Sequence, residues 1–150
     1  MRYLLDTHVL IWWITEDHRL SSNAAKIIRS HKNLLYWSTA SSWEMSIKWA
    51  LGRLELGEPL ESLIPAELTK NQIEIMPIEN KQAILAGQLP LHHKDPFDRM
   101  LIAQARLESM GIITNDSKFK SNLPIICCRF YTRLPADGCL LQRLFSPCTQ

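Results

Sequence analysis

The chain has 150 residues, of which 46% are hydrophobic and 21% charged, a composition typical of one folded domain and not of a disordered chain. Its net charge of +2, from 17 basic and 15 acidic residues, neither requires nor excludes a nucleic-acid partner. The longest apolar run, residues 9–14, is too short to span a membrane, and Asp6 interrupts the N-terminal segment before a signal peptide could form. We therefore expect a cytoplasmic protein without a membrane partner.

The first half of the chain alternates short apolar runs with segments of helical spacing. Residues 2–5 are typical of a buried strand, and Asp6 and Thr7 are both residues that favour the start of a helix. The further elements predicted for this half are helices over 8–16, 19–32 and 41–57 and a strand over 33–39.

The second half continues the alternation. Residues 59–71 have helical spacing but contain Pro65, so we expect a short or broken helix. The clearest helix covers 95–111, with Asp95 as N-cap, Pro96 at the first helical position and Gly111 at its C-terminal end. The other elements predicted here are a helix over 79–89 and strands over 73–78, 112–114 and 123–130.

Strands and helices that alternate in this way predict an α/β protein. We expect a three-layer α/β/α sandwich with a mostly parallel central sheet, formed by a single domain over residues 1–130. Residues 131–150 show no clear periodicity and form an atypical C-terminal segment, which is a disordered tail, an extra interaction segment or an extension of a degraded gene. The four cysteines all lie after residue 126 without metal-site spacing, so neither a zinc site nor a disulfide framework is predicted.

Four acidic residues lie where a parallel sheet gathers its ligands, in the crevice at the carboxyl ends of the strands. Asp6 ends the first strand and Asp116 follows the strand at 112–114. Glu44 and Asp98 lie in the first turns of the helices that begin near residues 41 and 95. We therefore predict that the four side chains converge at one edge of the sheet.

Each acid also has a purely structural interpretation. Asp6 favours a helix start, Asp116 a turn, and Glu44 the positive end of a helix dipole. Asp98 is the hardest to explain in this way, because it shares a helix face with the apolar residues three, four and seven positions further on. A carboxylate turned toward the sheet is costly unless it is paired, whereas Asp95 can stay solvated as the N-cap.

Clustered carboxylates need a positive charge. No lysine or arginine is placed at a strand end so that it could neutralise all four acids, and unneutralised carboxylates raise one another's pKa. A hard divalent cation such as Mg²⁺ or Mn²⁺ meets this need with oxygen ligands. The chemistry that uses such a cluster is phosphodiester hydrolysis, in which the metal activates and orients a water molecule.

Four segments of the chain carry a family resemblance. They are LLDTHVLIW (4–12), SSWEMSIKWALGRL (41–54), HHKDPFDRMLIAQA (92–105) and IITNDSKF (112–119). Together they make the chain resemble the PIN-domain ribonucleases, and most closely the VapC-type toxins of bacterial toxin–antitoxin pairs, over residues 1 to 130. The resemblance implies a Mg²⁺- or Mn²⁺-dependent endoribonuclease that a cognate antitoxin inhibits.

The resemblance also implies roles for individual residues. Thr7 matches the small hydroxyl residue after the first aspartate and Thr114 the threonine of T-x-D, so both are expected to tune the site through hydrogen bonds. Asp98 is expected to be a metal ligand and Asp95 a helix cap. The acidic site of the family falls on the residues that strand-end geometry also selects, Asp6, Glu44, Asp98 and Asp116.

Basic residues beside the acids are expected to form a rim that contacts RNA phosphates, with plain solvation as the alternative. The rim residues are Lys48, His93, Lys94, Arg99 and Lys118. The run at 9–14 is apolar around most of its helix, so we expect the first two helices to bind an antitoxin or a second subunit, and the protein to be a homodimer. Core packing is the commoner role for tryptophans such as Trp12 and Trp43.

Two hypotheses of other classes remain open. A response-regulator receiver also ends strands with aspartates, but it would need a second acid beside Asp6, where Thr7 stands, and a lysine at the end of a late strand. A catalytically silent PIN-like domain that binds RNA or protein would share the fold, and only an activity assay separates it from the enzyme.

Overall fold

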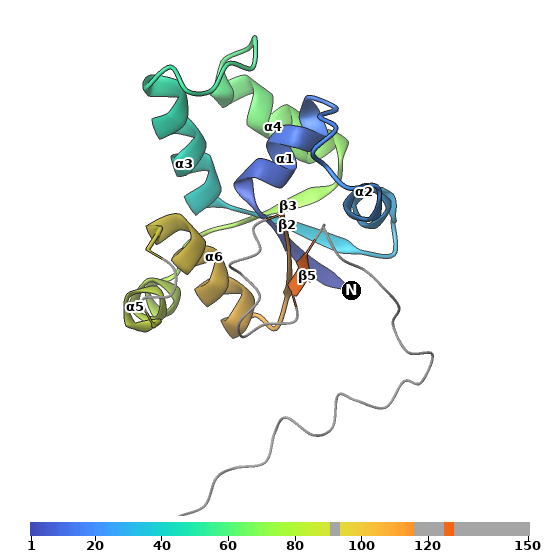
Figure 1. Cartoon of the computed structure of the whole chain (residues 1–150). Helices are drawn as coiled ribbons and strands as arrows, with labels where there is room; N and C mark the ends of the chain where they lie inside the picture. Colours follow the sequence, from blue (N-terminus) through green and yellow to red (C-terminus); the bar gives the residue numbers. More distant parts are fainter. Residues whose placement is uncertain (91–93, 116–124, 128–150) are drawn as a thin grey trace, which may run out of the picture.

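The central feature of the molecule is a five-stranded parallel sheet. Figure 1 shows the computed structural model of the chain, which describes residues 1–90, 94–115 and 125–127. The strand order is β3-β2-β1-β4-β5, and every neighbouring pair is parallel. The strands are β1 (Arg2–Leu5), β2 (Leu34–Ser38), β3 (Ile73–Met76), β4 (Gly111–Thr114) and β5 (Ile125–Cys127).

Helices cover both faces of this sheet, which confirms the predicted three-layer α/β/α fold. They are α1 (Thr7–Ile14), α2 (Ser22–Arg29), α3 (Thr39–Ala50), α4 (Leu60–Lys70), α5 (Asn80–Gln88) and α6 (Pro96–Leu107). In Figure 1, α1, α2 and α4 lie on one side of the strands and α5 and α6 on the other. Within the described ranges, no helix is long and apolar enough to cross a membrane.

Neighbouring residues of the central strand β1 belong to two different cores. Leu5 and its β4 partner Ile113 pack with residues of α1, α2 and α4. Leu4 and its partner Ile112 pack with residues of α5 and α6. All four side chains are fully buried, as expected where successive residues of a parallel strand point to opposite covered faces. The strand therefore holds both helical layers together.

Several helices begin with a side-chain cap at the carboxyl edge of the sheet. The hydroxyl of Ser38, at the end of β2, accepts a hydrogen bond from the amide of Ala40 at 3.0 Å and so starts α3. Asp95 accepts from the amide of Phe97 at 2.8 Å, and Pro96 occupies the first helical position of α6. The structure thus confirms the predicted role of Asp95 as an N-cap.

Two local predictions are wrong. Helix α4 runs unbroken through Pro65. The proline removes only the hydrogen bond to the carbonyl of Glu61, and both residues are exposed, so water can bind that carbonyl. At the end of α6 the residue in the left-handed region is Ser109, with a φ of 51°, and Gly111 instead begins β4.

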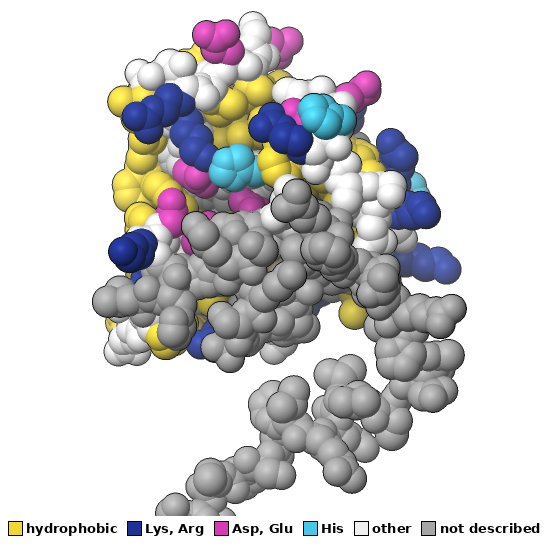
Figure 2. Space-filling model, in the orientation of Figure 1, with side chains coloured by type: hydrophobic (Ala, Val, Ile, Leu, Met, Phe, Trp, Pro, Cys, Tyr) yellow, Lys and Arg dark blue, Asp and Glu magenta, His cyan; other side chains and the backbone are white. Residues whose placement is uncertain are grey.

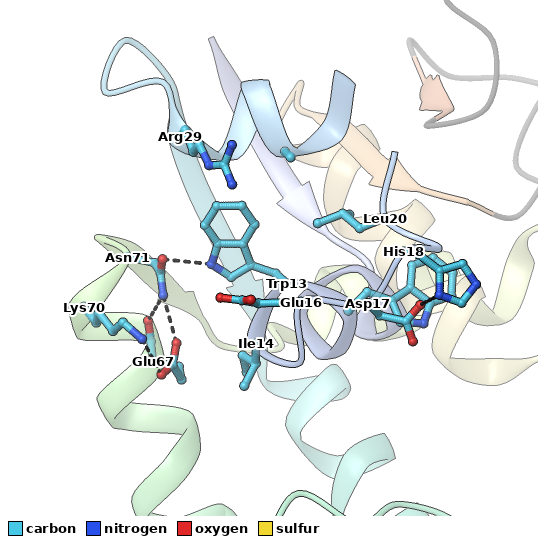
Figure 3. Close-up of a pocket in the computed structure, with 12 residues that line it drawn as sticks. Trp13, Ile14, Glu16, Asp17, His18, Leu20, Arg29, Glu67, Lys70 and Asn71 are labelled. Atoms are coloured by element: carbon cyan, nitrogen blue, oxygen red, sulfur yellow. Dashed lines mark hydrogen bonds and ion pairs between the residues drawn. The ribbon is translucent and has the colours of Figure 1, made fainter. Parts of the chain in front are cut away.

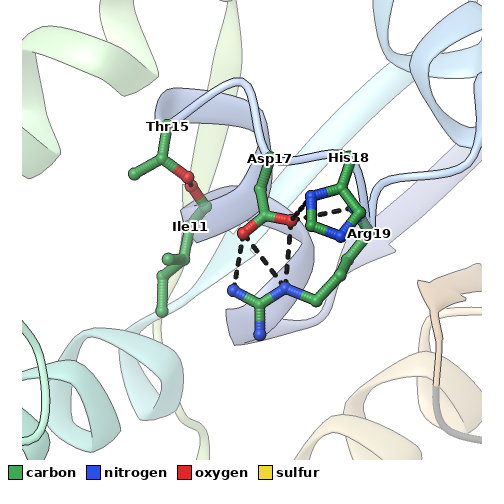
Figure 4. Close-up of polar contacts among 5 residues, drawn as sticks. All are labelled: Ile11, Thr15, Asp17, His18 and Arg19. Carbon is green, nitrogen blue, oxygen red and sulfur yellow. Dashed lines mark hydrogen bonds and ion pairs between the residues drawn. The ribbon is translucent and has the colours of Figure 1, made fainter.

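The turn after α1 is closed by side chains close in sequence (Figure 4). The hydroxyl of Thr15 donates to the carbonyl of Ile11 at 2.8 Å. Asp17 forms an ion pair with Arg19 at 2.5 Å, and the hydrogen bond from Arg19 lowers the pKa of Asp17 to about 2. The Arg19 guanidinium in turn lies 5.2 Å from the ring centre of Trp12. The turn therefore helps to cover α1.

Candidate active site

Asp6 is fixed from two directions at the carboxyl edge of the sheet. It directly follows β1 and caps α1, where its Oδ1 accepts a hydrogen bond from the amide of His8 at 3.3 Å. Its Oδ2 accepts a hydrogen bond from the hydroxyl of Thr114, at the end of β4, at 2.6 Å. Its own amide donates to the carbonyl of Ile113 at 3.0 Å. A strand end and a helix start thus set the position of this carboxylate.

Burial alone would raise the pKa of Asp6, because the residue is only 6% exposed. The contacts with His8 and the hydroxyl of Thr114 outweigh burial and hold the pKa below its ordinary value of 3.8. The pKa of His8 is raised, chiefly by its contact with Asp6. Asp6 is therefore ionised near neutral pH.

Glu44 lies on α3, in the second turn after the Ser38 cap, and its side chain is only 13% exposed. Its Oε1 is 2.6 Å from the Nζ of Lys48, one helical turn further along α3. A glutamate followed four residues later by a lysine is the favourable order for a helical ion pair. The acid therefore has a cationic partner within its own helix.

His8 and Lys48 link the two carboxylates. The Nδ1 atom of His8 is 3.8 Å from Oδ1 of Asp6, and its Nε2 atom is 3.2 Å from Nζ of Lys48. Sequence reasoning missed His8 and assigned Lys48 to the RNA-binding rim instead of to an ion pair with Glu44. The spacing of Glu44 and Lys48 on one helix was a usable signal for the ion pair, but the approach of α1 to α3, which brings His8 in, was not visible in the sequence.

Asp98 lies in the first turn of α6 and is partly buried. The rings of Phe97 and Trp43 meet edge to face, with centres 5.1 Å apart. These two aromatic residues directly precede Asp98 and Glu44, so their contact brings the starts of α6 and α3 together. The last acid, Asp116, lies outside the described residues.

The hydroxyl residues expected to tune the site differ in their contacts. Thr114 donates its hydrogen bond to Asp6. Thr7 is fully buried, and its Oγ1 has no hydrogen-bond partner among the residues that the structure describes. Ser41, in the first turn of α3, is buried and likewise has no such partner for its hydroxyl in the described part of the chain. Buried hydroxyl groups normally have a hydrogen-bond partner, and a bound water molecule could serve as the partner of each of these two.

The predicted basic rim is only partly present in the described residues. Lys94 is exposed, and Lys48 is paired with Glu44. The prediction for Arg99 is wrong, because its side chain turns inward and the residue is only 8% exposed. Its guanidinium donates to the carbonyls of Leu89, Pro90 and Gly87, at the C-terminal end of α5, where a cation is favourable. The other two rim residues, His93 and Lys118, lie outside the described ranges.

Charged side chains of both signs gather on one face of the molecule (Figure 2). Acidic side chains surround a histidine near the middle of this face, and lysine or arginine side chains lie next to them. The donor set consists of carboxylates, which suit a hard divalent cation. Among residues 1–90, 94–115 and 125–127, no three His, Cys, Asp or Glu side chains are close enough to hold a metal ion.

The fold and the site define an α/β protein with hydrogen-bonded carboxylates at the carboxyl edge of a parallel sheet. A model of the PIN domain matches residues 3–122. The chain belongs to the PIN domain family.

The relatives of the chain agree with this family. Ribonuclease VapC22 of Mycobacterium tuberculosis is 29% identical over 120 residues, which cover 79% of this chain and 90% of that protein. VapBC2 from Rickettsia felis, solved with a DNA fragment from its promoter, has a TM-score of 0.61 at 20% identity, with 83% of this chain and 97% of that chain covered. A toxin–antitoxin complex from Klebsiella pneumoniae has a TM-score of 0.59 at 18% identity, with 84% and 97% covered. At these identities the solved structures support the fold alone.

Proposed function

We propose that the chain is a Mg²⁺- or Mn²⁺-dependent endoribonuclease and the toxin of a toxin–antitoxin pair. The observation that carries the proposal is the ionised Asp6 at the end of the central strand, held beside Glu44 through His8 and Lys48. A PIN domain match and a relative named as a ribonuclease support the same chemistry. Its RNA substrate makes the cytoplasm the expected compartment.

The residues proposed to hold the cation are Asp6, Glu44, Asp98 and Asp116. When bound, a divalent cation lowers the pKa of a water molecule and stabilises the charge that develops on the phosphate. The hydrogen bond from Thr114 and the amide of His8 keep Asp6 ionised and correctly oriented as a ligand. The exposed Lys94 is proposed to contact an RNA phosphate, together with His93 and Lys118.

The proposed antitoxin site is a hollow of about 580 Å³ beside α1 (Figure 3). It is lined by residues of α1, α2, α4 and the turn after α1. At its centre the indole of Trp13 donates to Asn71 at 2.8 Å, and the guanidinium of Arg29 lies 5.5 Å from the ring centre. Its lining is more polar than apolar and carries charges of both signs, which would suit a charged peptide segment of an antitoxin.

The two aspartates of α6 provide the sharpest test of the enzyme. Asp98→Asn is nearly isosteric but loses a ligand charge, so we expect it to reduce Mg²⁺- or Mn²⁺-dependent RNA cleavage at least about 100-fold. Asp95→Asn is the matched control, because asparagine caps helices as well as aspartate does, and it should keep most of the activity. Cleavage of a structured RNA is measured with added metal and with EDTA.

The outcomes separate the alternatives. Wild-type activity in Asp98→Asn would contradict the role of Asp98, and equal loss in Asp95→Asn would mean that the wrong aspartate was assigned to the metal. A chain that binds RNA or an antitoxin but cleaves nothing with either metal would instead be a silent PIN-like binding domain.

A further inference from the structure

Lys48 is unusually enclosed for a surface lysine. Its side chain is 27% exposed, whereas Lys70, which pairs with Glu67 on α4, has a side chain that is 71% exposed. Its Nζ atom lies 2.6 Å from Oε1 of Glu44 and 3.2 Å from Nε2 of His8. One ammonium group thus contacts two side chains of the proposed site.

His8 is held in the orientation that this contact requires. Its ring centre is 5.9 Å from that of Trp12, at an angle of 43°, and its Nδ1 faces Asp6. An ammonium group can only donate, so the contact with Lys48 is a hydrogen bond in the form of His8 whose Nε2 atom carries no proton. His8 therefore contacts both Asp6 and Lys48, and Lys48 contacts Glu44, so the chain of contacts couples the positions of the two carboxylates.

We propose that Lys48 is the resident counter-ion of the acidic site, a positioning residue that holds Glu44 in place and competes with the divalent cation for its carboxylate. This inference rests on the metal site of the proposed function. Lys48 supplies a positive charge without metal, and the same charge opposes the arrival of a second cation. The Oε1 atom of Glu44 cannot bind the divalent cation and keep its full contact with Lys48 at the same time.

The proposal predicts a gain of metal affinity when the charge is removed. Lys48→Met keeps the length and helix propensity of the side chain, with Lys48→Gln as a second neutral variant. We expect either variant to bind Mn²⁺ roughly two- to fivefold more tightly, on the scale of a partly exposed ion pair. Without metal, in EDTA, both should melt below the parent, because the carboxylates lose their partner. Mn²⁺ binding to the full chain is measured by electron paramagnetic resonance and calorimetry.

Two controls distinguish this role from simple structural damage. Lys48→Arg keeps the charge and should restore parental Mn²⁺ affinity and melting in EDTA. Lys70→Met breaks a comparable helical pair on the surface away from the site and should leave Mn²⁺ affinity unchanged. Damage to the fold would weaken metal binding, so a gain of affinity is specific to competition.

The proposal is overturned if the parent does not bind Mn²⁺, or if neutral variants bind it equally or less tightly. RNA cleavage is followed separately. If Lys48→Met binds Mn²⁺ more tightly but the parent does not cleave RNA, the counter-ion role is supported and the nuclease function is contradicted. If the parent cleaves RNA but Lys48→Met binds Mn²⁺ no more tightly, the nuclease function is supported and the counter-ion role is contradicted.

Discussion

The contacts of Asp6 with His8 and Thr114 show how hydrogen bonds can decide the charge of a buried carboxylate. Asp6 is buried, and burial alone favours the neutral acid. The contacts with His8, together with a short hydrogen bond from the hydroxyl of Thr114, reverse that preference and lower the pKa of Asp6. Asp6 and Thr114 are separated by 108 positions, so no local pattern links them. Their contact exists because β1 and β4 are neighbours in the sheet.

Removing this hydroxyl should cost stability in a pH-dependent way. Thr114→Val keeps the shape but leaves a buried carboxylate oxygen without its donor, and we expect a loss of about 1–3 kcal/mol in the free energy of unfolding at pH 7. The folded-state pKa of Asp6 lies below 3.8, so its contribution is present above that pH and is lost as the pH falls through the folded-state value. The deficit of the variant should therefore shrink in acid.

Urea unfolding of the wild type and Thr114→Val between pH 3 and pH 8 measures this difference. Thr114→Ser, which keeps the hydroxyl, should lose much less at every pH. A deficit that stays constant down to pH 3 would show that packing, not the charge of Asp6, causes the loss.

At the scale of the elements, the sequence predicted every described strand and helix in the right order. Alternating apolar runs and helical spacing suffice for this, because the central strands β1 and β4 are almost entirely buried and the helix caps are local signals. The errors lie where a tertiary effect overrides a local one. Pro65 was expected to shorten or break α4, yet its exposed position lets the helix continue.

The cost of Pro65 can be measured directly. Pro65→Ala restores the amide that can donate to Glu61, and we expect it to increase the free energy of unfolding by about 1–2 kcal/mol, since the gain in the helix exceeds the added entropy of the unfolded chain. Pro59→Ala is the matched control. Pro59 precedes α4 as its N-cap, so no helical hydrogen bond is regained there. Thermal and urea unfolding give both values, and a destabilised Pro65→Ala would contradict this account of α4.

At the scale of the whole molecule, exposed apolar side chains lie on a different helix from the one expected. Trp12 of α1 is only 7% exposed, whereas Trp43, Ile47 and Leu51, one turn apart along α3 and its C-cap, are 60%, 37% and 58% exposed. The core-packing interpretation thus holds for Trp12 but not for Trp43. A contiguous apolar stripe of this kind is typical of a protein interface. We call these three residues the α3 stripe.

We predict that the α3 stripe forms the contact of the expected homodimer. The double variant Ile47→Lys, Leu51→Lys should be monomeric at concentrations where the parent is a dimer, because burying two ammonium groups is costly. Leu107→Lys, at a 42% exposed position on α6, should leave the dimer intact. Sedimentation velocity measures all three proteins, and a monomeric parent, or a double variant that still dimerises, would contradict the prediction.

How much of the site the sequence could predict depends on where each contact comes from. Asp6 and Glu44 follow from the rule that ligands gather at strand ends, and Asp95 from local capping chemistry. The bridge through His8 and Lys48 and the inward turn of Arg99 depend on how helices pack on one another. Side-chain direction on a helix is readable from its period, but the identity of the neighbour across a helix interface is not.

The place of β1 at the centre of the sheet has a consequence for the synthesis of the protein. β1 is made first, and β4, which pairs with its second edge, emerges from the ribosome only after more than 100 further residues. At about 5–20 residues per second, roughly 5–20 s pass before Thr114 can reach Asp6. During that interval Asp6 lacks its partner strand, so the nascent chain carries an incomplete site. A chain with this topology therefore assembles this part of the proposed site only after β4 has been synthesised.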